Sequence, residues 1–390
     1  MAWIGKPIPY DGPHLANPDA VIPLLAWAAR MKVADVSFST DDPVLVKLKG
    51  QWVSVTKYQL NGAQIERILK KITGVDNVIA KVAAGSDYDR AIAIDDPEVK
   101  DDFGEPLQHR FRLNLTGVSA GAGLGFHLVL RSINSTPPTI DSVSFPPSLR
   151  ELFAVTQGSF IIAGSTGSGK STTFAACLRE ILEGDTAIKG MILTFEAPVE
   201  YMFDKVDSTH STVKQTEIGV SLPSFAAGVR GALRRHPDLT VIGEVRDRET
   251  IKAMTELSMS GHPVFATTHA NSCIEIIRRL VENFPTEQYD QMFASIVNAS
   301  RLFMSQRLVR DQHGEMCVLR DWLYLTNADK RRLLDAGYQR HGELLRELLK
   351  NSKRAQSMKV SIDLAYEAGR FSDRQRLELY RTYGEDEGDE

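Results

Sequence analysis

The sequence predicts an α/β protein of two domains, a small α+β domain followed by a larger domain with a mostly parallel sheet. Three observations favour this architecture. The chain has 390 residues, whereas single hydrophobic cores rarely grow beyond roughly 250–300. Its first third groups short strands with helices set aside, and its middle alternates β-branched runs with helical stretches. Between these parts lie Pro137-Pro138 and Pro146-Pro147, pairs that resist both helix and central strand.

In the first part, residues 1–18 are rich in Pro, Gly and Asn, and we expect them to be a flexible segment. The domain itself is predicted to span residues 19–134. Helices are expected over residues 18–30 and 60–72, where apolar residues recur at helical spacing. Strands are expected at residues 35–39, 44–48, 51–55, 90–94, 109–115 and 125–131. Residues 135–150 form the predicted linker.

The second domain is predicted to span residues 151–384. β-branched runs predict strands at residues 160–163, 190–195, 239–243 and 263–268. Helical stretches between them imply a parallel sheet covered by helices on its faces. From about residue 284 the pattern is mainly helical. The acidic segment 385–390, Glu-Asp-Glu-Gly-Asp-Glu, is predicted to be a disordered tail.

Composition places the chain among ordinary globular proteins. It has 43% hydrophobic and 25% charged residues, and a net charge of -4 that demands no nucleic-acid partner. Three widely spaced cysteines argue against a disulfide framework and for a reducing compartment. The sequence shows no signal-peptide pattern and no apolar run near the ~20 residues that span a bilayer. We therefore expect a cytoplasmic protein that reaches a membrane only through partners.

Residues 164–171, Gly-Ser-Thr-Gly-Ser-Gly-Lys-Ser, fill the pattern G-x-x-x-x-G-K-[ST]. A strand candidate precedes them and a helix candidate over residues 172–182 follows, as a phosphate loop requires. Glycines let the backbone N–H groups point at phosphate oxygens, and the helix N-terminus adds positive potential. Lys170 is expected to bridge the β- and γ-phosphates, and the Ser171 hydroxyl to coordinate Mg²⁺. The predicted ATP-binding residues are Gly164, Ser165, Thr166, Gly167, Ser168, Gly169, Lys170, Ser171 and Thr172.

Three polar side chains follow later strand candidates, and ligands of open α/β sheets lie at such strand ends. Glu196 ends the strand at 190–195, Glu244 follows residues 240–243, and His269 follows residues 264–268. Glu196 and Glu244 could therefore converge with Lys170 on one crevice, with Glu244 reaching Mg²⁺ directly or through water. Taken alone, Glu196 is compatible with a solvated loop acid, and His269 with a hydrogen-bonded structural residue.

His262, His269 and Cys273 in this region suggest a metal site as an alternative. Their spacing fits no strong zinc pattern. The sequence therefore favours no metal other than Mg²⁺.

Four ordered segments resemble a known family. Residues 164–173, 193–201, 233–250 and 260–271 are similar to the Walker A loop, Asp box, Walker B segment and His box of the VirB11- and PilT-like secretion ATPase superfamily, the GspE family. The similarity extends over roughly residues 20–385. Residues 111–131 and 357–383 look most like the type IVB secretion and conjugation ATPases DotB and TraJ.

The resemblance implies a PAS-like N-terminal domain, a RecA-like P-loop ATPase domain with C-terminal helices, and a homo-hexamer. It implies ATP and Mg²⁺ bound between the domains, with Glu196 as catalytic base, Glu244 as the Walker B ligand of magnesium and water, and His269 as a γ-phosphate sensor. It also implies arginines from the N-terminal domain at the γ-phosphate. The candidates are Arg131, Arg112 and Arg110, although surface arginines are usually only solvated.

One position departs from the family. The Asp box usually has Glu-Asp-Pro, whereas this chain has Glu196-Ala197-Pro198.

The leading hypothesis is a motor that powers substrate transfer through a type IVB secretion or conjugation system. It would be recruited peripherally to an inner-membrane complex, together with another secretion ATPase. The alternatives are a type IV pilus retraction ATPase and, favoured only by Ala197, a weakly hydrolysing ATP-binding scaffold.

A motor that binds nucleic acid directly is a fourth possibility. Arg230, Arg234, Arg235 and His236 form a basic cluster beside the Walker B strand. That place favours an interface or phosphate-proximal role, so direct nucleic-acid binding is not expected.

Overall fold

The computed structural model describes residues 10–384 except 49, 102–103, 122 and 134–135. Within it the chain forms two compact units. Unit 1 comprises Met1–Thr136 together with Pro198–Met202, and unit 2 comprises Pro137–Ala197 together with Phe203–Glu390. Each unit has its own sheet and its own hydrophobic core. The segment 385–390, which the sequence predicts to be disordered, lies outside the described residues.

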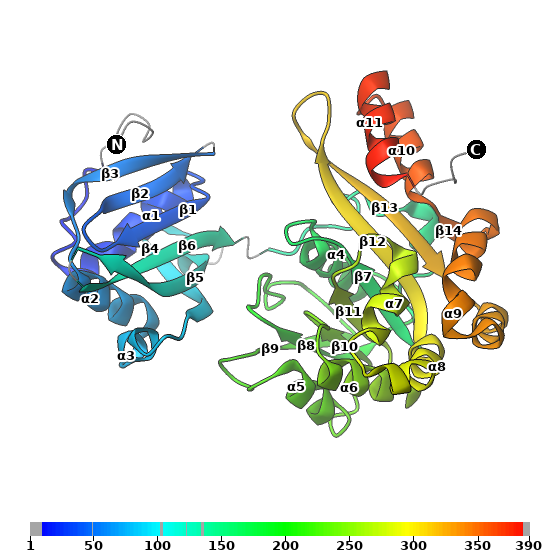
Figure 1. The fold of residues 1–390 in the computed structure, drawn as a ribbon. Coiled ribbons are helices and arrows are strands. Elements are labelled where there is room, and N and C mark those ends of the chain that lie inside the picture. Colours follow the sequence, from blue (N-terminus) through cyan, green and yellow to red (C-terminus); the bar gives the residue numbers. More distant parts are fainter. Residues whose placement is uncertain (1–9, 49, 102–103, 122, 134–135, 385–390) are drawn as a thin grey trace. The chain divides into compact units, whose positions relative to one another are not determined.

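Unit 1 is built on a six-stranded antiparallel sheet with strand order β3-β2-β1-β6-β5-β4 (Figure 1). Its strands are β1 Asp35–Ser39, β2 Pro43–Leu48, β3 Gln51–Gln59, β4 Tyr88–Lys100, β5 Pro106–Ala120 and β6 Gly123–Ile133. A 3₁₀ turn at Pro18–Ala20 leads into α1 Val21–Arg30, and the other helices are α2 Gly62–Thr73 and α3 Val78–Ala83. The predicted grouping of strands with helices set aside is confirmed.

Helix α2 shows how local sequence sets these elements. The Asn61 side chain accepts a hydrogen bond from the Gln64 N–H, and the Gln64 side chain accepts one from the Asn61 N–H, which closes a capping box. Gly74 ends the helix in a left-handed conformation at φ 65°. Between the caps, Ile65, Ile68, Leu69 and Ile72 form one apolar stripe buried against the sheet.

An apolar side chain anchors the described part of the N-terminal segment. Leu15 is 1% exposed and lies in the core of unit 1. Its N–H donates to the Tyr58 hydroxyl at 3.0 Å. The structure thus anchors this part of the predicted flexible segment at Leu15, whereas most of residues 10–18 are exposed. Residues 1–9 lie outside the described residues.

Unit 2 is built on an eight-stranded sheet with order β14-β13-β12-β7-β11-β10-β8-β9. The run from β12 to β9 is parallel throughout, and β13 and β14 add an antiparallel edge. Its strands are β7 Ser159–Ala163, β8 Gly190–Glu196, β9 Ser211–Glu217, β10 Leu239–Ile242, β11 Val264–Thr268, β12 Ser300–Arg310, β13 Met316–Tyr324 and β14 Ala355–Gln356. The predicted parallel α/β architecture is confirmed.

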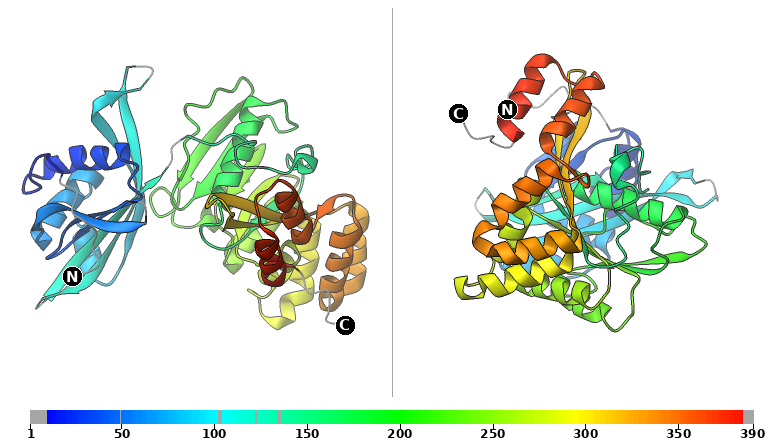
Figure 2. Two further views of the ribbon diagram at one scale, coloured as in Figure 1. Left: turned by 90° about the horizontal axis from the view of Figure 1, so that it is seen from above. Right: turned by 90° about the vertical axis from the view of Figure 1, so that its right-hand side faces the viewer.

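Helices cover both faces of this sheet, as the two views of Figure 2 let the reader follow. Phe160 of β7 and Phe265 of β11 face Phe174 of α4, with ring centroids 5.2 and 5.3 Å from it. The alternate residues Ile161 and Ala266 belong to the core on the opposite face. The helices of unit 2 are α4 Lys170–Glu183, α5 Phe225–Ala232, α6 Arg248–Met259, α7 Ile276–Val281, α8 Tyr289–Ala299, α9 Asn327–Asn351, α10 Met358–Glu367 and α11 Asp373–Tyr383.

Two parts of unit 2 differ from the sequence-based expectation. Beyond residue 284 the chain is not only helical, because β12 and β13 form a long antiparallel hairpin inside that stretch. Residues 137–150, assigned to a linker, belong to unit 2 and bury Ile140, Val143, Phe145 and Leu149. The regular element of this segment is the short 3₁₀ helix Pro147–Leu149, and the proline pairs do not prevent packing.

Candidate functional site

The loop that follows β7 has a backbone that only glycine tolerates at its critical points. Gly164, Gly167 and Gly169 have positive φ angles of 151°, 80° and 86°. A Cβ on Gly164 would lie 2.5 Å from the Gln306 carbonyl oxygen and 2.6 Å from the Ser168 hydroxyl. The loop then enters α4 at Lys170. This is the strand–loop–helix geometry that points successive backbone N–H groups at one anion.

Lys170 places its ammonium group over this loop. Its Nζ donates to the carbonyl oxygens of Gly164 at 2.8 Å and Ser165 at 3.0 Å. The Lys170 ammonium group is therefore held by carbonyl groups of the same loop whose backbone N–H groups would bind the anion. Lysine in this position acts as a point charge for phosphate oxygens.

A buried polar network supports the loop from behind. The Gln306 amide on β12 donates to the Ser168 carbonyl at 2.6 Å and accepts from the Thr173 hydroxyl of α4 at 2.7 Å. Its oxygen also accepts from Arg320 Nε on β13 at 2.8 Å. Arg320 donates further to the carbonyls of Val143 and Ser144 at 2.9 and 2.7 Å. The network joins the hairpin and the pre-β7 segment to the phosphate loop.

Arg320 is 2% exposed, so its charge is neutralised mainly by these oxygen dipoles. Burial lowers the pKa of Arg320 to about 10, which leaves the guanidinium charged at neutral pH. Sequence analysis did not identify Gln306 or Arg320. Polar residues at alternating positions in a strand carry no distinguishing pattern, and their partners lie far away along the chain.

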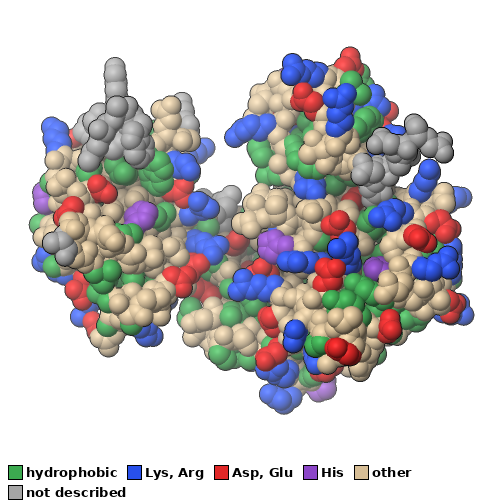
Figure 3. Space-filling model, viewed as in Figure 1, with side chains coloured by type: hydrophobic (Ala, Val, Ile, Leu, Met, Phe, Trp, Pro, Cys, Tyr) green, Lys and Arg blue, Asp and Glu red, His purple; other side chains and the backbone are tan. Residues whose placement is uncertain are grey.

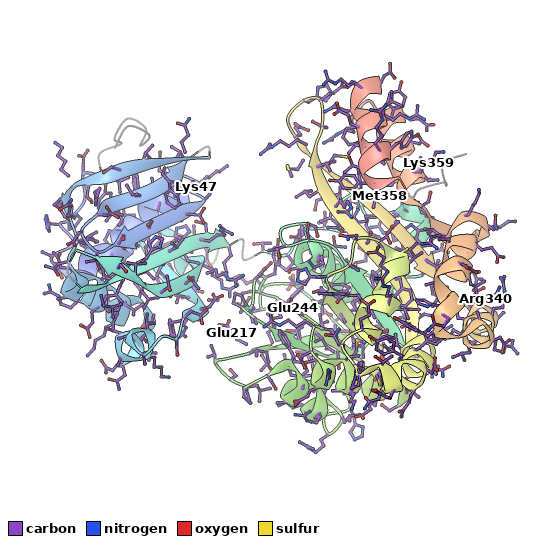
Figure 4. The ribbon with its side chains drawn as sticks, viewed as in Figure 1. Lys47, Glu217, Glu244, Arg340, Met358 and Lys359 are labelled. Atoms are coloured by element: carbon purple, nitrogen blue, oxygen red, sulfur yellow. The ribbon has the colours of Figure 1, made fainter. Side chains whose placement is uncertain are left out.

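The carboxyl ends of β7, β11, β10 and β8 lie at one edge of the sheet because these strands are adjacent and parallel. Glu244 follows β10, where Figure 4 labels it, and His269 follows β11. His269 Nε2 and Glu244 Oε1 are 3.0 Å apart, and Arg246 lies 3.5 Å from the other Glu244 oxygen. The structure thus brings the histidine and the second predicted carboxylate into contact.

Glu196 ends β8 at the same edge. Its Oε1 accepts from the Thr194 hydroxyl at 2.5 Å and from the Gln215 amide of β9 at 3.1 Å. These two donors fix the direction of the carboxylate. Glu196 is therefore an oriented group at the strand end rather than a solvated loop acid. Ala197 directly after it is exposed.

A pocket of about 460 Å³ opens beside the loop. The start of the phosphate loop and His269 line it together, and so do Arg278 and Arg279 of α7. Arg278 Nε lies 2.7 Å from Glu282, which also lines the pocket. Sequence analysis did not identify the two arginines, because charged residues on a helix are usually only solvated. The pocket is polar, and its lining combines the two arginines with the carboxylates of Glu275 and Glu282.

His262, His269 and Cys273 are not part of any group of three or more His, Cys, Asp or Glu side chains that could hold a metal ion among the described residues. His262 lies 3.1 Å from the Ser260 hydroxyl, and the Cys273 side chain is buried. The Cys273 N–H instead donates to Asp321 at 3.2 Å. Oxygen donors that suit Mg²⁺ are present at Ser171, at the start of α4, and at Glu244.

The three candidate arginines lie on one face of the sheet of unit 1. Arg112 on β5 pairs in register with Arg131 on β6, and Arg110 lies two residues before Arg112. Arg131 Nε binds the buried Asp35 at 2.7 Å, and Arg112 binds both oxygens of Asp89 at 3.1 and 2.5 Å.

Arg110 contacts the short segment that groups with unit 1. Its guanidinium donates to the carbonyls of Val199 and Glu200 at 2.8 and 3.1 Å. Each of the three arginines therefore has a fixed direction within unit 1.

A parallel sheet whose inner strand enters a glycine-rich loop and a helix defines a RecA-like P-loop nucleotide-binding protein. Comparison with known proteins narrows this class. Residues 103–358 match the family described as Type II/IV secretion system protein, and the chain belongs to that family.

Three relatives illustrate the similarity. The X-ray structure of the Legionella pneumophila ATPase DotB superposes with a TM-score of 0.83 at 28% identity, covering 97% of this chain and 100% of that one. The pilus retraction motor PilT with bound ADP gives a TM-score of 0.74 at 25% identity, covering 92% and 96%. The type IV pilus retraction ATPase PilT of Pseudomonas aeruginosa is 28% identical over 291 residues, which are 75% of this chain and 78% of that one.

These similarities confirm the predicted fold, a PAS-like N-terminal domain followed by a RecA-like ATPase domain, and the predicted superfamily. The chain is a secretion or pilus ATPase of the DotB, PilT and GspE kind. Among the described residues, no helix is both long enough and apolar enough to cross a bilayer.

Proposed function

We propose that the chain is a hexameric motor that hydrolyses ATP to power substrate transfer through a type IVB secretion or conjugation system. The observation that carries the choice of pathway is the likeness to DotB, which spans 97% of the chain with a TM-score of 0.83. The likeness to the retraction motor PilT is somewhat lower, at 0.74 over 92%. Pilus retraction is therefore the second candidate, and it would use the same catalytic residues.

ATP binding rests on the loop at residues 164–172. Its N–H groups and Lys170 would hold the β- and γ-phosphates of ATP. The related motor PilT has been solved with bound ADP, which supports a nucleotide site in this family. The Ser171 hydroxyl would coordinate Mg²⁺, and Glu244 would do so directly or through water. Bound Mg²⁺ would neutralise charge that develops on the phosphate oxygens.

Glu196 would act as the general base towards the attacking water. The Thr194 hydroxyl and the Gln215 amide orient its carboxylate, as the positioning of a general base requires. His269 would sense the γ-phosphate, and its contact with Glu244 would couple that sensing to the magnesium ligand. Arg110, Arg112 and Arg131 would stabilise γ-phosphate charge as arginine fingers do, exchanging their present partners for the nucleotide.

Motor action would follow from closing and reopening the two units around nucleotide in each subunit of a ring. We propose that the ring works in the cytoplasm, at the cytoplasmic face of an inner-membrane secretion complex. A second secretion ATPase would be present there. A weakly hydrolysing scaffold is the remaining alternative, favoured only by Ala197.

Measuring phosphate release with Mg²⁺-ATP directly tests the hypothesis that the protein hydrolyses ATP. The purified chain should turn over well above a Lys170→Ala control, and turnover no higher than that control would leave only the scaffold. Host mutants separate the two motor roles. Loss of effector or plasmid transfer with intact twitching motility supports secretion or conjugation, and loss of twitching alone supports pilus retraction.

A further inference from the structure

A second pocket lies far along the chain from the phosphate loop. It has a volume of about 670 Å³ and is walled by the end of α9, by β14, by the start of α10 and by the end of α11. Met358 and Lys359, labelled in Figure 4, mark its α10 wall. The proposed function makes no use of this pocket.

The pocket is strongly basic. Arg346, Lys350, Lys359 and Arg381 line it, and no Asp or Glu does so among the described residues. They come from three different helices, so the positive charge surrounds the pocket rather than following one helix face. Ser357 caps the N-terminus of α10 at the same wall, which adds the positive end of a ten-residue helix.

Apolar surface lies beside this charge. Val360 lines the pocket and is 46% exposed, and Leu364 and Leu377 on the same two helices are 53% and 57% exposed. Figure 3 shows basic and hydrophobic side chains sharing the surface of α10 and α11. The surface therefore suits an acidic peptide segment more than a small inorganic anion.

The chain itself carries such a segment next to the pocket. Residues 385–390, Glu-Asp-Glu-Gly-Asp-Glu, hold five carboxylates in six residues. They are joined directly to Gly384, which lines the pocket. Six residues reach at most about 20 Å, and a segment tethered at the wall of the pocket has a high effective concentration there. The five Asp and Glu side chains of this segment are complementary in charge to the four Lys and Arg side chains that line the pocket.

We propose that the basic pocket holds the acidic segment 385–390 of the same chain. The pairing is electrostatic, so it weakens as salt rises. This binding is independent of the proposed ATPase function, because it involves none of the nucleotide-site residues.

Binding of residues 385–390 in the basic pocket could affect the nucleotide pocket through a chain of side-chain contacts. Tyr383, the last residue of α11, packs on the Arg307 guanidinium with 4.4 Å from its carbon to the ring centroid. Arg307 donates to the Asn271 carbonyl at 2.7 Å, and Asn271 lines the nucleotide pocket. Holding residues 385–390 would therefore help to fix the end of α11 and, through Arg307, the loop after β11.

The test uses a fluorescent peptide with the sequence of residues 384–390 and a full-length variant whose five acids are neutralised (E385Q, D386N, E387Q, D389N, E390Q). In anisotropy measurements at low salt, the neutralised variant should bind the peptide at least about tenfold more tightly than the unmodified chain, whose own segment competes. Adding Lys350→Glu and Lys359→Glu to the neutralised variant should abolish binding. Arg340→Glu, an exposed change on α9 outside the pocket, should not.

Lysine acetylation read by mass spectrometry provides a second measurement on intact protein. Lys350 and Lys359 should react several-fold faster in the neutralised variant than in the unmodified chain, with the exposed Lys353 unchanged. Equal peptide binding to both proteins, no binding to the neutralised variant, or equal acetylation of Lys350 and Lys359 in both would overturn the proposal. Phosphate release is not needed for either readout, so failure here is distinct from failure of the ATPase reading.

Discussion

Replacing Gln306 with alanine tests whether the phosphate loop is held in shape by the β12–β13 hairpin. The Gln306 amide makes three hydrogen bonds to the Ser168 carbonyl, the Thr173 hydroxyl and Arg320 Nε, at 2.6, 2.7 and 2.8 Å. Truncation removes all three at once. Two neutral groups and one charged group then lose a buried partner.

The magnitude follows from these partners. A buried neutral group left unpaired costs about 1–3 kcal/mol, and a charged group costs more. The space left by the amide is polar and large enough for a water molecule, which would recover part of the loss. We expect a net loss of about 3 kcal/mol in the free energy of unfolding. For a domain of this size that lowers Tm by roughly 6–12 °C.

ATP affinity should also fall, by about tenfold, because the loop would hold its phosphate-binding geometry for only a fraction of the time. Calorimetric unfolding measures the first effect, and titration with a non-hydrolysable ATP analogue well below Tm measures the second. Gln312→Ala is the matched control, since Gln312 donates only to the exposed Gly369 carbonyl at 2.8 Å through its side chain. A Gln306→Ala protein with unchanged Tm and unchanged affinity would refute the reasoning.

Three further substitutions test other parts of the account. Ala197→Asp restores the carboxylate usual in the family and should raise phosphate release by about tenfold; an unchanged rate would mean that position 197 does not limit turnover. Arg307→Met removes the Asn271 contact and should weaken nucleotide binding severalfold in equilibrium titration, whereas Arg310→Met, whose guanidinium contacts only the turn at Gly314, should not. Burial lowers the pKa of Lys330 to about 8, so the unfolded chain binds more protons than the folded chain between about pH 8 and pH 10.5, and stability rises there. Lys330→Met should remove that rise in urea unfolding and add about 1 kcal/mol at pH 7; an unchanged pH profile would contradict the assignment.

The sequence was most informative where chemistry and local geometry coincide. The loop at residues 164–171 was predicted because glycine spacing, a preceding β-branched run and a following helical pattern all lie within a short stretch. Glu196, Glu244 and His269 are predicted because each directly follows a strand candidate, and the structure places all three at the carboxyl ends of parallel strands.

The missed features depend on long-range contacts. Gln306 and Arg320 lie in the strands of a hairpin that sequence analysis placed in a mainly helical region. Their role depends on Ser168, which is 138 residues from Gln306 along the chain. The proline pairs of residues 135–150 predict a linker. The sequence does not show that the buried Arg320 donates hydrogen bonds to the carbonyls of Val143 and Ser144 in this segment.

The central claim is that ATP is hydrolysed at the sheet edge with Glu196 as the base. Glu196→Gln keeps the size and shape of the side chain, but the uncharged amide cannot act as a base. The account predicts that ATP affinity stays within about threefold while single-turnover phosphate release falls by about 10²–10⁴. Glu217→Gln is the control, because Glu217 ends β9 directly beside Glu196 in the register of the sheet. Unchanged phosphate release in Glu196→Gln, or an equal loss in Glu217→Gln, would contradict the assignment.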